Sequence, residues 1–428
     1  MLASISTTPV AGDGPARRRT GWVAMYPAAY DAERAFKNHR DFTLQNWSDG
    51  GEIMHYTFLH MSEFFPQAII HRAGPISTLD ENPRHDVAAF EVETALGKLT
   101  LEQYVEQGPV NGIVIIQGGK VVFERYPRMR RFDKHLLMSV SKIFVSTVIA
   151  ILEDRGQLAS DAPVESYLPE LTGSGWEGVR VRDILDMASG IDCLESDEPG
   201  AYTDPSTGYY QYEASLGWLA PTEATMESTY EYVATLRRRR PPGEAFEYTS
   251  LNTFVLSWLA ERITGQRFHE VVSELIWSKL GAGSDALIST SRLGAPASHG
   301  GISATVRDVA RLGMLFTPDW ELVSSEPIVS SNHLRQIQEL GRPALFENGG
   351  VGRGIIERLR GERPRHNSWQ WDFVTEEGDF FKGGYGGQGL YVSPIRHLVI
   401  AFTGTPGLDK QANELMWISR QLAQRWLG

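Results

Sequence analysis

The chain has 428 residues, of which 42% are hydrophobic, 10% aromatic and 22% charged. This composition is typical of a globular protein and excludes a disordered or collagen-like chain, while the length predicts about two or three domains. Its 41 Lys and Arg residues against 53 Asp and Glu residues give a net charge of −12, which disfavours generic binding to nucleic acids or anionic membranes.

The N-terminal residues 1–20 contain three consecutive arginines but no apolar run after them, so we expect a disordered tail rather than an export signal. The sequence has no apolar stretch long enough for a transmembrane helix. Cys193 is the only cysteine, which rules out an intrachain disulfide and is compatible with a reducing compartment. We therefore expect a soluble, cytoplasmic protein.

Residues 21–98 mix aromatic residues and short apolar runs without clear periodicity, and we expect an N-terminal extension packed on a catalytic unit formed by residues 99–428. Two apolar runs in 111–126 flank Gly118 and Gly119, which is typical of a β-hairpin. Residues 139–156 then predict a helix that is apolar on all sides and hence buried.

Helical patterns dominate the middle of the chain, at 180–189, 250–264, 268–280 and 305–317. A long irregular segment, 190–218, interrupts them and is typical of a lid or binding loop. Strand patterns return near the C-terminus in SWQWDFV, GLYVSP and HLVIAFTG, followed by a helix from about 409. The order predicts an α+β fold in which both ends of the chain close one antiparallel sheet, with an all-helical subdomain inserted at about 160–300.

Ser139 and Lys142 stand at the start of the apolar 139–156 helix, three positions apart and therefore on one face. A lysine in apolar surroundings loses the solvation of its charged form, which lowers its pKa and lets it act as a base. A serine nucleophile requires such a base because its free hydroxyl is too weak. The alternative is an N-capping serine beside a surface lysine, since S-x-x-K is expected about once by chance in a chain of this length.

Tyr248, Thr249 and Ser250 open the helix predicted at 250–264. Ser250 could simply cap that helix while Tyr248 packs beside it. Alternatively, the phenol and the hydroxyl point at the same serine and transfer its proton.

Lys382 precedes Gly383 and Gly384 just before the strand pattern GLYV. Glycines on a strand edge let a substrate backbone approach closely. The N–H of Tyr385 follows, and together with the N–H of Ser139 it could stabilise an oxyanion.

Together the three elements S-V-S-K, Y-T-S and K-G-G resemble those of the serine β-lactamase and penicillin-binding-protein superfamily, in the same order. The segments VRVRDILDMASG, PPGEAFEYTSLNTFVLSWLAERITG, SHGGISATVRDVARLG and KGGYGGQGLYVSP are also similar to that superfamily. The resemblance covers most of residues 99–428. Within the superfamily, the chain looks most like 6-aminohexanoate-dimer hydrolases and related family VIII-type carboxylesterases.

The resemblance implies a β-lactamase/DD-peptidase-like fold in which Ser139 is the nucleophile, Lys142 its base and Tyr248 the proton shuttle to the leaving group. It makes Ser250 a supporting residue and places Lys382 beside a substrate carboxylate or in the proton network. Ser250 stands where antibiotic-hydrolysing members have asparagine, and Gly383 lacks the hydroxyl of K-T-G. The glutamate that deacylates class A enzymes has no counterpart, so deacylation would fall to Tyr248 and Lys142.

The sequence thus predicts a serine hydrolase (amidase or carboxylesterase) that cleaves an ester or amide bond of a small molecule through an acyl-enzyme, without metal or cofactor. An acyltransferase of the same fold, a β-lactamase and a non-catalytic binding or sensing protein remain alternatives. Tyr209 and Tyr210 either line a substrate lid or anchor the long loop. We expect no nucleic-acid or membrane partner, and a homo-oligomer is compatible with the sequence.

Overall fold

Seven antiparallel strands form the main sheet of the computed structural model, which describes residues 26–196 and 198–425. The disordered tail expected at 1–20 lies outside these residues. The strand order is β5-β4-β13-β12-β11-β10-β9. The bounds are β4 Val110–Gln117, β5 Lys120–Arg125, β9 His366–Ser368, β10 Trp371–Val374, β11 Phe380–Gly384, β12 Gln388–Ser393 and β13 Leu398–Gly404.

The sheet joins a hairpin that begins at Val110 to strands from the C-terminal part of the chain, as the sequence predicted. β4 and β5 form the expected hairpin, and its turn residues Gly118 and Gly119 have positive φ angles of 54° and 73°, which glycine adopts at no steric cost. β4 then pairs with β13, with Ile115 opposite Ile400. The N-terminal hairpin is therefore completed by a strand from nearly 300 residues later in the chain.

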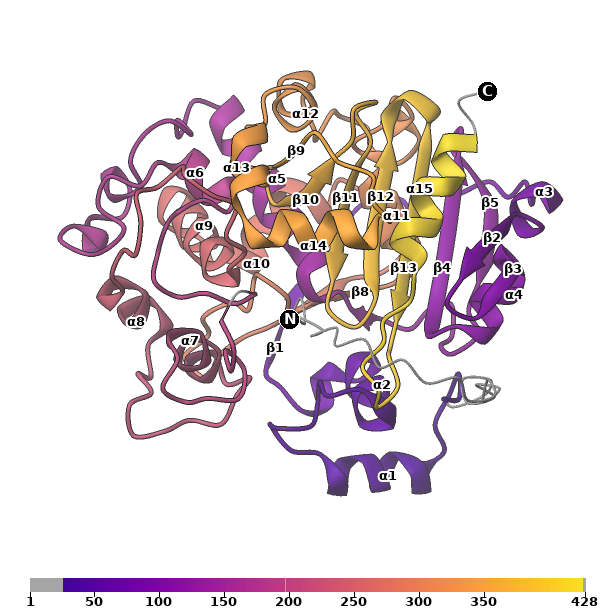
Figure 1. Cartoon of the computed structure of the whole chain (residues 1–428), viewed down its shortest axis with the longest axis horizontal. Helices are drawn as coiled ribbons and strands as arrows, with labels where there is room; N and C mark the ends of the chain where they lie inside the picture. The colour runs from indigo at the N-terminus through magenta and orange to yellow at the C-terminus, as the bar shows by residue number, and fades with distance from the viewer. Residues whose placement is uncertain (1–25, 197, 426–428) are drawn as a thin grey trace, which may run out of the picture.

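Helices cover both faces of this sheet (Figure 1). Side chains of a strand alternate between faces, so Ile400 packs in the same cluster as Ile418 of α15 (Leu415–Arg425). Val399 points to the other face, where α11 (Val306–Met314) lies against β13. Two helical layers around an antiparallel sheet make an α+β fold, which confirms the predicted class.

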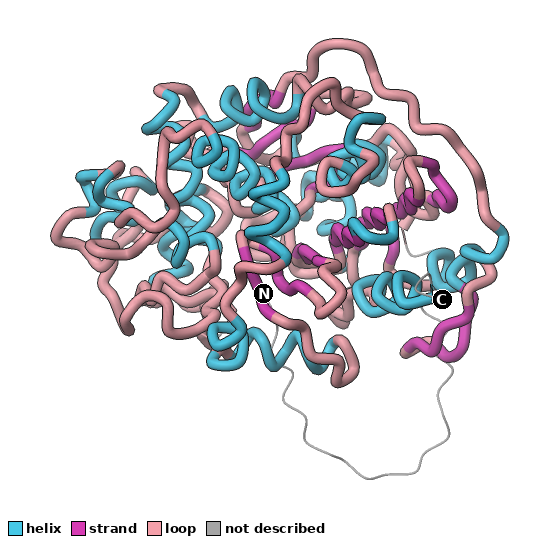
Figure 2. The backbone as a smooth tube through the Cα atoms, turned by 90° about the horizontal axis from the view of Figure 1, so that it is seen from above, coloured by secondary structure: helices cyan, strands magenta, loops and turns pink. Residues whose placement is uncertain are grey.

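The other half of the molecule is mainly helix and loop, and Figure 2 shows it at one side of the strands. Its α9 (Ser250–Thr264) spans the predicted range, and α5 (Lys142–Asp154) is buried along nearly all of its length. The further helices are α6 Val181–Leu185, α7 Gly208–Leu216, α8 Thr229–Thr235 and α10 Phe268–Val272, the last continued by a π-helical turn at Ser273–Trp277.

The prediction of an irregular 190–218 segment is wrong in its second half, because α7 occupies Gly208–Leu216. Thr207 caps this helix by accepting a hydrogen bond from the Tyr210 N–H, and Gly217 ends it in the left-handed conformation. All helical residues after Gly208 are buried. A helix buried on every side has no amphipathic periodicity by which the sequence could reveal it.

The N-terminal residues contribute α1 (Ala32–Asp41), α2 (Gly51–Leu59) and β1 (Gln67–Ile70). β1 belongs to a second sheet with the order β1-β7-β8-β6, which the sequence did not predict. The bounds of the other elements are α3 His85–Ala88, β2 Glu91–Thr94, β3 Gly97–Thr100, α4 Leu101–Gln107, β6 His135–Leu136, β7 Ala286–Ser289, β8 Ile302–Ala304, α12 Ser331–Gln338, α13 Pro343–Asn348 and α14 Gly350–Arg358.

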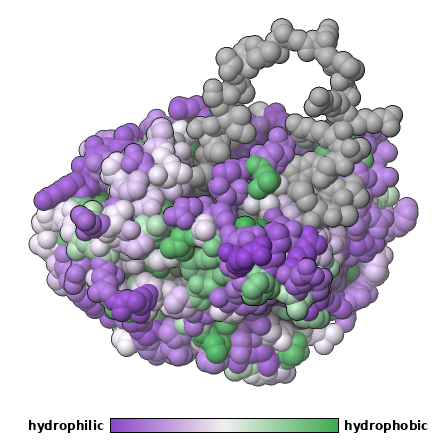
Figure 3. Space-filling model, turned by 90° about the horizontal axis from the view of Figure 1, so that it is seen from below, coloured by the Kyte–Doolittle hydropathy of each residue, from purple (hydrophilic) through white to green (hydrophobic). Residues whose placement is uncertain are grey.

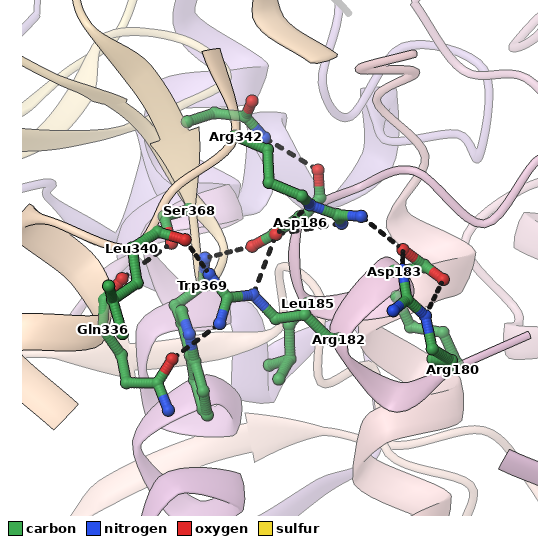
Figure 4. Close-up of polar contacts among 12 residues, drawn as sticks. Arg180, Arg182, Asp183, Leu185, Asp186, Gln336, Leu340, Arg342, Ser368 and Trp369 are labelled. Atoms are coloured by element: carbon green, nitrogen blue, oxygen red, sulfur yellow. Dashed lines mark hydrogen bonds and ion pairs between the residues drawn. The ribbon is translucent and has the colours of Figure 1, made fainter. Parts of the chain in front are cut away.

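A buried ionic cluster connects the helical half to the sheet (Figure 4). Asp186, which follows α6 and is fully buried, accepts hydrogen bonds from Arg182 Nε at 2.9 Å and from Arg342 Nε at 3.1 Å. It also accepts a hydrogen bond at 3.1 Å from the backbone N–H of Trp369, which lies in the turn between β9 and β10. Since a buried carboxylate must be paired, this cluster fixes α6 against the strands that lead to the candidate site.

Seen from below, the surface of the molecule has hydrophobic residues in separate areas among hydrophilic ones (Figure 3). Among the residues that the structure describes, no helix is both long and apolar enough to cross a membrane.

Candidate active site

Ser139 lies on a 3₁₀ turn, Met138–Ser141, that leads directly into α5. Met138 has a φ angle of +46°, a left-handed conformation that is unfavourable for a residue with a side chain and that is found more often at functional sites. Ser139 itself is only partly buried, whereas Lys142 at the first position of α5 is fully buried. The predicted helix therefore begins with a strained turn that presents the serine to solvent and its lysine neighbour to the interior.

Lys142 Nζ contacts three neutral oxygen atoms. It lies 3.1 Å from Ser139 Oγ, 2.9 Å from Ser250 Oγ and 2.9 Å from the carbonyl oxygen of His299. Burial lowers the pKa of Lys142 from 10.5 to about 7, with the charge of Glu195 opposing the shift and that of Lys382 adding to it. Near neutral pH the amine is therefore available to accept the proton of Ser139.

Tyr248 is placed between the two lysines. Its ring centroid lies 5.1 Å from Lys142 Nζ and 4.7 Å from Lys382 Nζ, and Lys382 Nζ donates a hydrogen bond to its hydroxyl at 2.9 Å. Burial raises the pKa of Tyr248 well above its usual value, and a hydrogen bond with Ser139 opposes that shift. The phenol is thus protonated at neutral pH and lies within hydrogen-bonding reach of the serine.

Ser250 is the first residue of α9, and its N–H donates to Glu195 Oε2 at 2.7 Å. Its hydroxyl accepts from Lys142, whereas the N-cap position of α9 is Thr249 and has no side-chain capping hydrogen bond, so the capping alternative for Ser250 is wrong. The structure therefore brings the four residues Ser139, Lys142, Tyr248 and Lys382 together with Ser250 in one connected set of hydrogen bonds.

The glycines after Lys382 allow β11 to lie directly against the serine. A Cβ atom on Gly384 would lie 2.6 Å from the carbonyl oxygen of Leu137 and 3.1 Å from the nitrogen of Ser139, so a larger residue does not fit without displacement. Gly384 ends β11, and Tyr385 follows in the turn to β12. This arrangement sets the backbone at Gly384, one residue before Tyr385, next to the backbone at Ser139.

The site contains charged residues that sequence reasoning missed. Asp372 on β10 accepts from Lys382 Nζ at 2.5 Å and from the Gly383 N–H at 2.8 Å. Glu213 Oε1 lies 3.1 Å from Nε2 of His299. His299 is the residue whose backbone carbonyl accepts a hydrogen bond from Lys142. The sequence did offer one signal for Asp372, because it is the only charged residue in the predicted strand SWQWDFV.

Tyr209 and Tyr210 are both buried in α7. The Tyr209 hydroxyl donates to Glu213 Oε1 at 2.7 Å, and the Tyr210 hydroxyl donates to the carbonyl of Ala220 at 3.0 Å. Whether they line the substrate path stays a prediction. Cys193 is buried as well, and burial raises the pKa of its thiol well above the usual value. Among the described residues, no cluster of three or more His, Cys, Asp or Glu side chains could hold a metal ion.

Comparison with known proteins places this geometry in a family. The family model described as Beta-lactamase matches residues 99–418. The chain is 31% identical over 392 residues to a 6-aminohexanoate-dimer hydrolase of Paenarthrobacter ureafaciens, a match that covers 90% of this chain and 91% of that protein.

Two solved structures have the same fold. One, from Bacillus anthracis and assigned to the 6-aminohexanoate-dimer hydrolases, superposes with a TM-score of 0.77 at 21% identity, covering 90% of this chain and 97% of its own. The other is EstCE1, a hydrolase with promiscuous acyltransferase activity, with a TM-score of 0.54 at 15% identity, covering 72% of this chain and 92% of its own.

Proposed function

The chain belongs to the beta-lactamase family, and we propose that it is a serine hydrolase that cleaves a carboxylic ester or amide bond of a small molecule through an acyl-enzyme. The observation that carries this proposal is the contact of the fully buried Lys142 amine with Ser139 Oγ at 3.1 Å, at a lysine whose pKa is lowered to about 7. The similarity to a 6-aminohexanoate-dimer hydrolase supports linear amides as one substrate class.

The acylation step follows from the positions of these groups. Ser139 Oγ attacks the substrate carbonyl carbon while neutral Lys142 accepts its proton. The backbone N–H groups of Ser139 and Tyr385 donate to the developing oxyanion. Tyr248 then gives its proton to the leaving oxygen or nitrogen as the bond to the acyl carbon breaks, and it regains a proton through its contacts with the two lysines.

Deacylation reverses the roles with water in place of the leaving group. Tyr248 and Lys142 remove a proton from the attacking water, and Ser139 leaves with its proton restored. The net change is the addition of one water across the ester or amide bond. No other group is required, since every proton given up in one half-reaction is returned in the other.

The proposal is tested by Ser139→Ala, assayed with p-nitrophenyl butyrate and with a linear amide such as the 6-aminohexanoate dimer. We expect hydrolysis to be lost while thermal unfolding is unchanged, because Ser139 is only partly buried and its side chain is small. Intact-mass measurement of the native protein should show an acyl adduct on Ser139. Undiminished turnover in the folded variant would overturn the proposal.

A further inference from the structure

Lys382 has an anionic partner within the protein itself. Its side chain is fully buried, and its ammonium group lies 2.5 Å from Asp372 Oδ1. The other oxygen of the same carboxylate accepts a hydrogen bond from the backbone N–H of Gly383 at 2.8 Å. Both oxygens of Asp372 are therefore occupied by consecutive residues of β11, the strand that leads to the candidate site.

The pairing of the two strands builds this contact into the fold. Phe373 pairs with Phe381 and Val374 with Phe380 across antiparallel strands. Continuing that register places Asp372 opposite Lys382, where side chains of facing residues lie on the same side of the sheet. The carboxylate is thus held by the sheet and is not a mobile surface group.

We propose that Asp372 is a specificity-determining residue that selects against acyl donors whose leaving group carries a carboxylate beside Lys382. The inference rests on the proposed function, because it assumes that Tyr248 faces the leaving group. Lys382 donates to the Tyr248 hydroxyl, so an anion on the leaving group close to the scissile bond would lie next to Lys382 and Asp372 together. The substrates selected are neutral at that position.

The reason is electrostatic. The charge of Lys382 is already compensated by Asp372, so a second carboxylate gains little attraction from it. The same carboxylate would approach the negative charge of Asp372 in a partly buried site, where like charges repel more strongly than in water. An alcohol or amine leaving group meets no such penalty. Neither does a carboxylate separated from the scissile bond by several methylene groups, as at the end of a linear amide.

The test compares two esters with the same acyl group, phenyl butyrate and meta-carboxyphenyl butyrate, each corrected for its rate of alkaline hydrolysis. For the native protein we expect kcat/KM to favour the neutral ester by at least about tenfold. Asp372→Asn should shift this ratio toward the anionic ester by about tenfold or more, which corresponds to about 1.4 kcal/mol. A general loss of activity caused by the altered Lys382 contact lowers kcat/KM for both esters and therefore cancels in their ratio.

Glu376→Gln is the matched control, because Glu376 is an exposed acid in the turn between the same two strands. It removes one negative charge from this hairpin and should leave the ratio unchanged. If the Asn variant does not fold, Asp372→Ser gives the same readout with a smaller neutral side chain.

Each outcome decides a separate question. Equal kcat/KM for the two esters in the native protein overturns the inference, as does an unchanged ratio in a folded Asp372 variant that retains turnover dependent on Ser139. Turnover that persists in Ser139→Ala overturns the proposed function instead, and the inference with it.

Discussion

Replacing Lys142 gives the most quantitative expectation, because the structure determines its protonation. The amine is fully buried and surrounded by neutral oxygen atoms, and desolvation lowers its pKa from 10.5 to about 7. At pH 7 about half of the molecules then carry the neutral amine, compared with fewer than about one in a thousand for an unperturbed lysine. At 1.36 kcal/mol per pKa unit, the shift corresponds to roughly 5 kcal/mol of destabilisation of the charged form.

The sign of the pH dependence follows from this. Protonated Lys142 cannot accept the proton of Ser139, so kcat/KM should rise with pH, pass its midpoint near pH 7 and level off above it. Stability should change in the same direction. Between about pH 7 and 10.5 the unfolded chain holds a proton on this lysine that the folded chain does not, so this group makes folding more favourable as pH increases through that window.

The assay is kcat/KM for p-nitrophenyl butyrate from pH 5.5 to 9.5, together with Lys142→Met, which keeps an unbranched side chain one atom shorter and removes the base. General base catalysis contributes about 10²–10⁴-fold, so the variant should lose at least about 100-fold in rate. A profile that is flat over this range, or a folded Lys142→Met variant with nearly native turnover, would refute the reasoning.

Three further changes test other parts of the structure. Tyr248→Phe should lower kcat by about 10²–10⁴-fold with little change in thermal unfolding, because the ring still packs while the proton donor is lost; an undiminished kcat would exclude that role. Gly384→Ala should lower activity by about 100-fold, since its Cβ would displace the backbone at the nucleophile, whereas Gly354→Ala, with nothing within 4 Å and in a helix, should leave activity intact and raise stability by about 0.5–1 kcal/mol. Asp186→Asn should cost about 3–5 kcal/mol in denaturant unfolding because it removes the charge of a fully buried carboxylate paired with two arginines, against less than about 0.5 kcal/mol for Asp161→Asn, an acid that is 86% exposed; equal losses would contradict the structural role of the cluster.

The parts of the site that were predictable from sequence are those set by local geometry. Ser139 and Lys142 are one helical turn apart, and Ser250 begins a helix with a clear apolar pattern. Glycines beside Lys382 indicated a close backbone approach, which the contact of Gly384 with the 137–139 backbone explains. Such signals lie within a few residues of one another, where spacing alone determines which side chains share a face.

The parts that were missed depend on contacts between distant segments. Asp372 meets Lys382 only because of the register of β10 and β11, and a shift of one residue would turn its side chain to the opposite face. Glu195 reaches the N–H of Ser250 across 55 residues of sequence. The α-helix predicted from residue 139 begins only at Lys142, because the residues before it form a 3₁₀ turn. The positive φ angle of Met138 in that turn is imposed by the fold and is not indicated by the residue type.

The connections around the site explain how these distant segments keep a common geometry. Ser139 and Ser250 begin helices of the helical half, whereas Lys382 and Tyr385 belong to the sheet and its turn. The Asp186 cluster holds α6 against the β9–β10 turn, and thereby holds the strand that carries Asp372. α2 of the N-terminal residues contacts the turn after Tyr385, because Met54 and Phe58 lie next to Gly386.

That support is close enough to matter for the oxyanion donor. Gly386 has a φ angle of +86°, which favours glycine, and a Cβ atom there would lie 2.5 Å from the flexible terminal methyl carbon of Met54 in α2, so the turn and the helix are in close contact. The Asn413 side chain donates to the carbonyl of Gly387 at 2.8 Å and holds the same turn from the C-terminal side. Since the proposed oxyanion N–H is that of Tyr385, one residue before Gly386, we expect the N-terminal residues to affect the proposed chemistry by positioning this turn.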